Sequence, residues 1–277
     1  WTDHINDFNY SIGGNITYSR FWDWEQYKPR FSNSWDEYRN SIWHRVGYVN
    51  WGYEAIGRFQ NWEQIANYPI DNDRKGNRTV VPGDIMYKDQ NNDGVINYLD
   101  ERPIGYRVDS TPTLNFGINL SASWKGFDLA MDWTGSGMTS WNQCYETARP
   151  FQNDGNSPDE VLKDAWHLSD IWDANSPLIP GKYPMIRLNT DETSAYDKSS
   201  YWLHNVTYLK LRNLEVGYTF PKTWLNKTGI SNLRLFVSGT NLLTLSNLSV
   251  MDPECASDNG LDYPPMRVIN IGVNLKF

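Results

Sequence analysis

The 277-residue sequence contains only two cysteines, Cys144 and Cys255, too few for the disulfide framework of a small secreted domain. One bridge and two free thiols are both compatible with this number. The sequence also lacks any run of about 18 apolar residues, so it contains no transmembrane helix. This does not exclude a membrane protein, because the strands of a transmembrane barrel alternate in polarity and need only about 10 residues each. The mean hydropathy of −0.64 fits a barrel and a soluble β protein equally well.

Positive charge is also scarce. The chain has 25 Lys and Arg residues against 33 Asp and Glu, which gives a formal net charge of −8 at pH 7, and no basic stripe is visible. A nucleic-acid partner is therefore not expected. The sequence begins at Trp1, with neither Met nor a charged and apolar leader. We therefore expect an internal fragment or a processed product.

Signatures of catalysis are missing too. We find no nucleophile or metal-hydrolase motif and no glycine-rich phosphate loop, and the four histidines show no ligand spacing. The chain is therefore not expected to be an enzyme. A β-rich glycoside hydrolase stays open as a minor alternative, because the separation of a carboxylate pair cannot be read from a sequence.

Aromatic residues, in contrast, are abundant, with 14 Trp and 17 Tyr. Aromatic girdles at the two interfaces of a membrane barrel would use many of them. Surfaces that stack on sugar rings would also use them, so aromatic content alone does not decide the function. Trp22, Trp24 and Trp133 are best interpreted as girdle residues.

Alternation with a period of two dominates the chain and predicts an all-β fold. Over 114–124 every even residue is apolar or alanine, whereas the odd residues are small and polar. Lys125-Gly126 then forms a two-residue turn, and 127–133 returns with the same apolar face. A phase slip near Asn213 predicts a β-bulge. About seven strands are expected, within 8–20, 43–59 (weaker), 114–124, 127–133, 207–220, 232–244 and 267–277.

The connections between these strands are unequal. The stretches 60–112, 139–206 and 246–266 are long, whereas Lys125-Gly126 and 221–231 are short. Short turns alternating with long loops are typical of outer-membrane barrels. Within 139–206, Ser157 and Pro158 followed by two acidic residues predict a helix over about 158–170. The sequence ends on a strand whose last residue, Phe277, resembles the assembly signal of bacterial barrels.

Several segments, in order, resemble the SusC/RagA family of TonB-dependent outer-membrane transporters. Together they span most of residues 45–277, whereas 1–44 match only as a strand of the right kind. The segments that carry the resemblance are Pro82 to Asp89, Arg102 to Gly105, Thr113 to Leu129, Tyr201 to Leu203, Tyr208 to Thr219, Val237 to Thr244 and Asn274 to Phe277.

This resemblance implies that 1–277 is the C-terminal part of a receptor barrel of about 22 strands with a plugged lumen. The plug and the N-terminal barrel strands are absent from the sequence, so the sheet must close against further strands. The family also implies a multi-pass barrel in the outer membrane of Bacteroidetes-type bacteria, a SusD-like surface lipoprotein as partner, and energy from the TonB complex. Counting back from the last strand makes the three long loops extracellular, including the loop 139–206.

The segment 89–100 has the spacing of a calcium-binding loop. Oxygen ligands fall at positions 1, 3, 5, 9 and 12, a backbone carbonyl falls at position 7, and Gly94 stands where the loop must turn. Asp at position 12 replaces the usual Glu. We expect Ca²⁺, or alternatively Mg²⁺, to order an extracellular loop, and an Asx-rich turn without metal is the other interpretation. The expected ligands are Asp89, Asn91, Asp93, Val95, Asn97 and Asp100.

Four tryptophans of the long loops are candidate contacts with cargo or lipoprotein: Trp141, Trp166, Trp172 and Trp202. For each of them, local packing of the loop is the competing interpretation. The expected function is TonB-dependent import of a nutrient oligomer, either an oligosaccharide or an oligopeptide. The main alternative is a secreted, calcium-dependent carbohydrate-binding β-sandwich.

Overall fold

The structure is a computed structural model that describes residues 1–277 except 48, 107–111, 189–192, 227–228, 256 and 258, several of which fall in the predicted loops. Its main feature is a seven-stranded antiparallel sheet in which each strand pairs with the next one along the sheet, in the order β1-β2-β9-β10-β13-β14-β15. The strands are β1 (Thr2–Ile5), β2 (Phe8–Tyr18), β9 (Leu114–Trp124), β10 (Phe127–Asn142), β13 (Leu203–Thr219), β14 (Asn232–Ser246) and β15 (Val268–Lys276).

Six of the expected strands are confirmed, but the seventh is not the one expected. The stretch 43–59 divides into three pieces of two to four residues that pair outside the main sheet. Gly47, Gly52 and Gly57 interrupt its alternation, so no continuous strand of spanning length forms. The seventh strand is β1, which folds back on β2 through a turn at Asn6-Asp7. The predicted bulge is confirmed, because the β10–β13 register shifts between the pairs Asp132–Asn213 and Trp133–Leu211.

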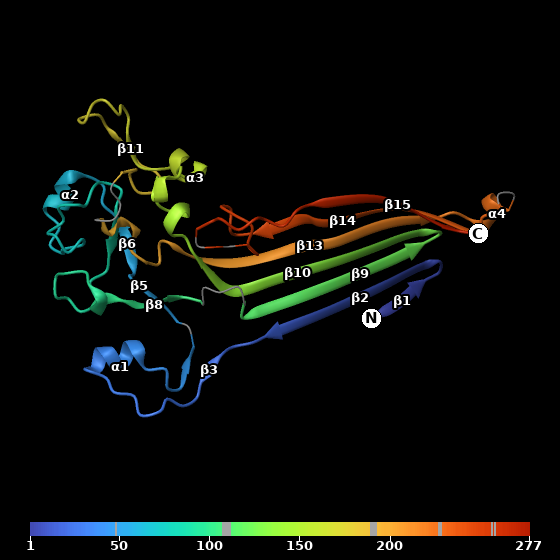
Figure 1. Cartoon of the computed structure of the whole chain (residues 1–277), viewed down its shortest axis with the longest axis horizontal. Coiled ribbons are helices and arrows are strands. Elements are labelled where there is room, and N and C mark those ends of the chain that lie inside the picture. The colour runs from blue at the N-terminus through green and yellow to red at the C-terminus, as the bar shows by residue number, and fades with distance from the viewer. Residues whose placement is uncertain (48, 107–111, 189–192, 227–228, 256, 258) are drawn as a thin grey trace.

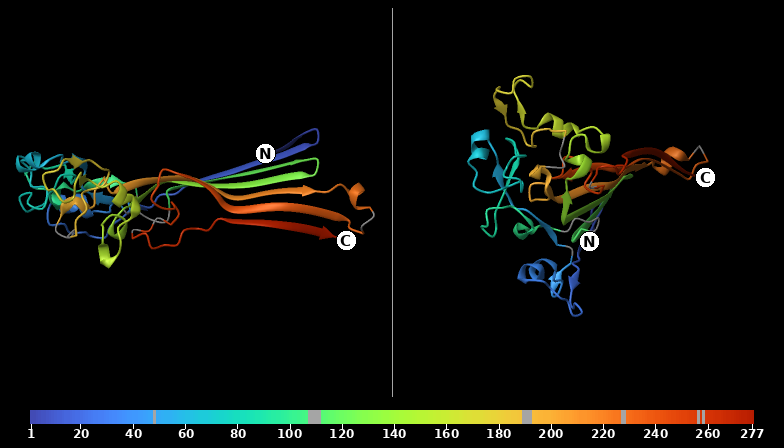
Figure 2. Two further views of the ribbon diagram at one scale, coloured as in Figure 1. Left: turned by 90° about the horizontal axis from the view of Figure 1, so that it is seen from above. Right: turned by 60° about the vertical axis from the view of Figure 1, so that its left-hand side comes forward.

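Turns and loops lie at opposite ends of the sheet (Figure 1, Figure 2). At one end, the β1–β2 turn, Lys125-Gly126 and the segment with α4 (Lys222–Leu225) connect the strands. Lys125 and Gly126 both have positive φ, at 46° and 90°, as a type I′ hairpin turn requires. A Cβ on Gly126 would lie 2.6 Å from the Thr219 carbonyl oxygen, so glycine is needed there. All three long connections lie at the other end, as expected.

The first two long connections fold into a lobe of short elements. The predicted helix over 158–170 is much shorter and ends at Lys163, because Ala165 and His167–Leu168 form bridge and strand pairs with Tyr183 and Leu178–Ile179 instead. The elements of the lobe are β3 (Trp22–Asp23), α1 (Ser34–Asn40), β4 (Arg45–Val46), β5 (Asn50–Gly52), β6 (Ala55–Arg58), α2 (Trp62–Ala66), β7 (Ile85–Tyr87), β8 (Arg102–Gly105), α3 (Asp159–Lys163), β11 (His167–Leu168) and β12 (Leu178–Ile179), with four single 3₁₀ turns.

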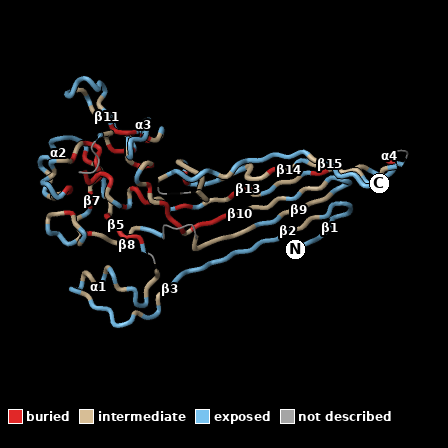
Figure 3. Tube along the Cα trace, viewed as in Figure 1, coloured by how far each residue is buried: buried red, intermediate tan, exposed pale blue. Residues whose placement is uncertain are grey.

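The buried core lies in this lobe and at the adjoining strand ends, not on the long strands (Figure 3). The largest cluster includes Ile85, Tyr87, Ile96 and Trp202. Cys144 and Cys255 form no disulfide. Among the described residues, no helix is long and apolar enough to cross a membrane.

Candidate functional site

One face of the sheet is apolar, and most of its side chains are exposed or half-buried, with the greatest exposure on the outer strands. On β15, Ile271 and Val273 are 84% and 53% exposed, and on β2 Ile16 is 74% exposed. At the turn end, four aromatic residues from neighbouring strands form a row through directly opposite pairs: Phe8, Trp124, Phe127 and Tyr218. An aromatic row bordering an exposed apolar band is typical of the lipid-facing surface of a barrel.

The height of this band can be worked from the register. On β9 the apolar face runs from Trp124 at the turn end to Leu114 at the loop end, which is opposite Tyr18. Ten residues at about 3.4 Å span roughly 34 Å along the strand. At a strand tilt of about 40° this becomes about 26 Å along the barrel axis, which matches the ~25 Å apolar band of outer-membrane barrels. Trp133, which was expected in a girdle, lies inside the band, opposite Ile118 and Leu211.

The other face of the sheet is polar and cross-linked between strands. Asp132 of β10 accepts hydrogen bonds from Asn119 of β9 at 2.7 Å and from Asn213 of β13 at 3.2 Å. Nearer the turns, the Arg234 guanidinium of β14 bridges Asp128 and Glu215. Charged and amide side chains of this kind line the water-filled interior of a barrel.

These two faces exclude the β-sandwich alternative for the described part of the chain. A sandwich buries the apolar face of one sheet against a second sheet about 10 Å away. The remaining sheets of this structure have only two strands each and belong to the lobe, so none covers the apolar face.

Three of the four candidate contact tryptophans are buried in the lobe. Trp141, Trp166 and Trp202 are 1%, 4% and 2% exposed, and the Trp202 indole N–H donates to the Ala195 carbonyl. Burial of this degree leaves no ring face for an external ligand and favours the packing interpretation for these three. Trp172 is 90% exposed, so the contact proposal is kept for Trp172 alone.

The segment 89–100 folds into a compact loop held by its own carboxylates. The two Asp89 oxygens accept from the backbone N–H groups of Asn92 and Gly94 at 2.7 and 2.8 Å. Asp100 is fully buried and accepts from the backbone N–H groups of Gln90 and Asn97, both at 2.8 Å. Among the described residues, no three Asp, Glu, His or Cys side chains converge closely enough to hold a metal ion. The metal assignment therefore stays a prediction.

A second Asx-rich loop, 71–79, pairs with this one through the bridge between Asp71 and Val95. Its anchor is Asp73, which accepts from the backbone of Lys75, Asn77 and Thr79 and from the Thr79 hydroxyl, at 2.7–2.9 Å. Burial acts to raise the pKa of Asp73, but these hydrogen bonds to the charged carboxylate outweigh it and lower the pKa to about 2.

The last long connection is fastened to the polar face of the sheet. Lys210 of β13 is completely buried, and its ammonium group contacts both Asp252 and Glu254 at 2.8 Å. Glu254 also pairs with Arg212. Burial acts to raise the pKa of Glu254, but hydrogen bonds from Arg212 and Lys210 outweigh it and hold the pKa below its ordinary value. Sequence reasoning missed this cluster because its members are about 40 residues apart and the pattern gives no pairing signal.

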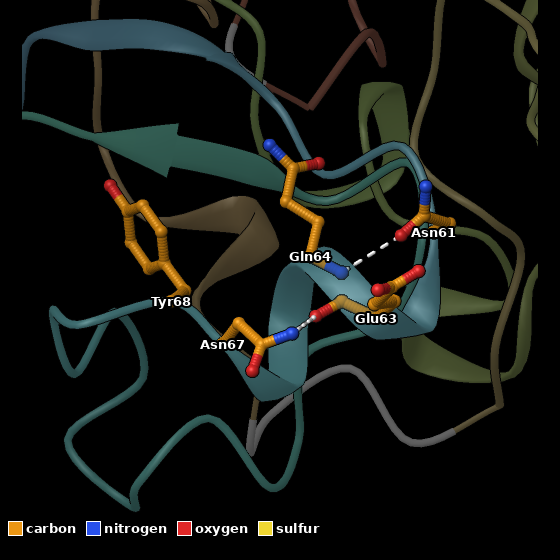
Figure 4. Close-up of a pocket in the computed structure, with 5 residues that line it drawn as sticks. All are labelled: Asn61, Glu63, Gln64, Asn67 and Tyr68. Carbon is orange, nitrogen blue, oxygen red and sulfur yellow. Dashed lines mark hydrogen bonds between the residues drawn. The ribbon is translucent and has the colours of Figure 1, made fainter.

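A small pocket beside α2 is explained by the capping of that helix (Figure 4). The Asn61 side chain accepts from the Gln64 backbone N–H at 2.8 Å at the start of the helix. At its end, the Asn67 side chain donates to the Glu63 carbonyl at 3.0 Å. Glu63 and Tyr68 complete the rim, and the polar groups are largely engaged with the helix termini.

The fold and its two faces define a class: the described sheet is one part of the wall of a large antiparallel β-barrel. A scan against protein-family models found no match. The sequence is 30% identical to TonB-dependent receptor P3 of Formosa agariphila over 243 residues, which is 81% of this chain and 22% of that receptor. It is 24% identical to TonB-dependent receptor SusC of Bacteroides thetaiotaomicron over 252 residues, 84% of this chain and 20% of that receptor.

Solved structures of the RagAB peptide transporter have the same fold. One of them covers 100% of this chain and 28% of its own, with a TM-score of 0.63 and 21% sequence identity. The chain belongs to the SusC/RagA-type family of TonB-dependent receptors, which confirms the resemblance and the predicted fold class. It spans about a fifth of the length of the curated relatives that it matches.

Proposed function

We propose that this chain forms the C-terminal part of an outer-membrane barrel that imports a nutrient oligomer in a TonB-dependent manner. The observation that carries the proposal is the division of the sheet into an exposed apolar face of membrane height and a cross-linked polar face. A wall of this kind separates lipid from an aqueous lumen. The lobe of long connections then lies outside the cell, and the turn end lies in the periplasm.

The partners follow from the family. We propose a SusD-like lipoprotein over the lobe, a plug and further strands that close the two sheet edges, and the TonB complex as the source of energy. Both sheet edges, β1 and β15, have no neighbouring strand within the described residues, and open edges are not tolerated in lipid. Cargo is an oligosaccharide or an oligopeptide. One solved relative is described as a peptide transporter, which favours testing peptides first.

Uptake by whole cells tests this function. Cells with the full-length gene, cells lacking it, and cells treated with a protonophore are supplied with fluorescent peptides from a protein digest or with fluorescent maltooligosaccharides. Import of one of these classes should require both the gene and the proton-motive force. Equal uptake of every probe by cells with and without the gene would contradict the proposal.

We also propose that the 89–100 loop takes up Ca²⁺ or Mg²⁺ and that the ion stabilises the lobe. The donor set of carboxylates, amides and one carbonyl suits a hard cation, and Ile96 at position 8 is fully buried and anchors the loop. Asp89, Asn91, Asp93, Asn97 and Asp100 would supply side-chain oxygens, and Val95 its carbonyl.

Calorimetric titration of the full-length protein with Ca²⁺ and then Mg²⁺ tests this second proposal. Asp93 is suited to substitution because its carboxylate contacts only residues of the same loop. Asp93→Ala should abolish binding, whereas Asp159→Ala, which removes an exposed carboxylate elsewhere in the lobe, should leave it intact. Absence of binding by the unmodified protein, or equal binding by both variants, would leave the Asx-rich turn as the explanation.

A further inference from the structure

A cavity of about 910 Å³ lies where the loop end of the sheet meets the lobe. Its walls come from the end of β2, the β3–β4 pair, β8 and the loop ends of β10 and β13. Its lining includes Tyr18, Arg20, Phe21, Trp22, His44 and Arg45.

The cavity continues from the apolar face of the sheet. Tyr18 lies on the same face as Phe8, Ile12 and Ile16, at the upper end of the band whose height matches the membrane core. Asn205, another lining residue, contacts Ser140 at 3.2 Å at the loop end of β13. The cavity therefore opens directly above the apolar band, at the level where lipid headgroups lie in the proposed orientation.

The charged side chains among the described lining residues are basic. Among the described residues that line it there are two arginines and one histidine but no Asp or Glu, although the chain as a whole carries a net charge of −8. The Asp23 carboxylate lies beside Gly47 but does not line the cavity. Within the part of the chain that the structure describes, neither Arg20 nor Arg45 forms an ion pair, and Arg45 donates only to the Tyr38 carbonyl.

Half-exposed aromatic rings line the same cavity. Tyr18, Phe21 and Trp22 are 57%, 54% and 50% exposed. Amphipathic aromatic rings are enriched at the headgroup level of membranes, and basic pockets there bind anionic headgroups. We propose that this cavity holds the phosphorylated headgroup of an outer-leaflet lipid, with the phosphate near Arg20 and Arg45 and the acyl chains along the apolar face of β2.

An acidic cargo oligomer would satisfy the same charge, but the position argues against it. Cargo passes along the polar face, where Asp132 and the Arg234 bridges lie, whereas Tyr18 lies on the opposite face. The proposal rests on the membrane orientation given above under the proposed function, so the test must separate the two.

The full-length protein is reconstituted into phosphatidylcholine nanodiscs that contain a bis-phosphorylated glycolipid or its dephosphorylated counterpart. Retained lipid is then counted by native mass spectrometry. The double variant Arg20→Gln/Arg45→Gln removes both cavity charges. The control Arg30→Gln removes an exposed arginine that does not line the cavity.

Wild type and the control should retain the phosphorylated lipid, whereas the double variant should bind it at least about tenfold more weakly. Each basic residue near a membrane surface contributes on the order of a fivefold change in affinity, and the double variant lacks two of them. Equal retention by all three proteins would overturn the lipid site. Displacement of the lipid by an acidic oligosaccharide would also overturn it and assign the cavity to cargo. Failure of every protein to enter nanodiscs would defeat the membrane orientation itself, and with it the proposed function.

Discussion

A single arginine placed on one face or the other of β9 should have very different effects. Leu120 lies near the middle of the apolar band, between Ile12 and Met131 of the neighbouring strands. Ser121 follows on the opposite, polar face and is exposed. The two positions are adjacent on one strand and lie at nearly the same depth between the same two strands. The main difference between them is the medium that the new side chain meets.

The magnitude follows from the position. An arginine on the lipid face near the bilayer midplane costs about 2–4 kcal/mol. On the lumen face the charge stays in water, so this cost of desolvation does not arise. Leu120→Arg should therefore destabilise the full-length barrel by about 3 kcal/mol, and Ser121→Arg by less than about 1 kcal/mol. The free energy of unfolding is measured by guanidinium titration in lipid vesicles, with folded barrel detected by its migration on unheated gels. Equal effects of the two substitutions would refute the assignment of faces, and a larger effect of Ser121→Arg would reverse it.

Three further outcomes are expected. Lys210→Met leaves two carboxylates facing each other without their buried cation, at a local cost of about 3–5 kcal/mol, so limited proteolysis should cut 247–267 much faster than in the unmodified protein. The pKa of Asp73 is lowered to about 2, so the stabilising contribution of its carboxylate is complete above about pH 4 and is lost as the pH falls toward 2. Pepsin cleavage near this loop should therefore rise as the pH falls from about 4 to about 2. Asp73→Asn should remove this pH dependence. In a background without native cysteines, Trp172→Cys should react with a membrane-impermeant maleimide on intact cells. Thr223→Cys should react only after the outer membrane is permeabilised. The opposite pattern would contradict the proposed orientation of the sheet in the membrane.

The sheet was largely predictable from the sequence because its information is local. Period-two alternation sets both the strand and the face of each residue, and Lys125-Gly126 can form only a tight turn. The strand β1 was not predicted, because its four residues show too little alternation to distinguish a strand from a loop. The stretch 43–59 was predicted as a strand of the main sheet because it contains apolar residues. In the structure its short strands pair within the lobe instead.

The lobe was far less predictable, because its structure depends on contacts between distant segments. The tryptophan content left external contact and local packing both open. The structure shows Trp141 and Trp202 in the core, with the Trp141 indole N–H donating to the Ser257 carbonyl. The cationic cavity is likewise invisible in the sequence, where Arg20 and Arg45 are 25 positions apart. A spacing rule found the 89–100 loop only because all of its donors belong to one short segment.

Native mass spectrometry of the full-length protein, extracted in detergent from its own outer membrane, tests the central claim most directly. The account predicts a barrel polypeptide of several times this length, together with a lipoprotein and a releasable oligomer whose mass distinguishes peptide from glycan. A lone species of about 32 kDa that stays soluble without detergent would contradict it.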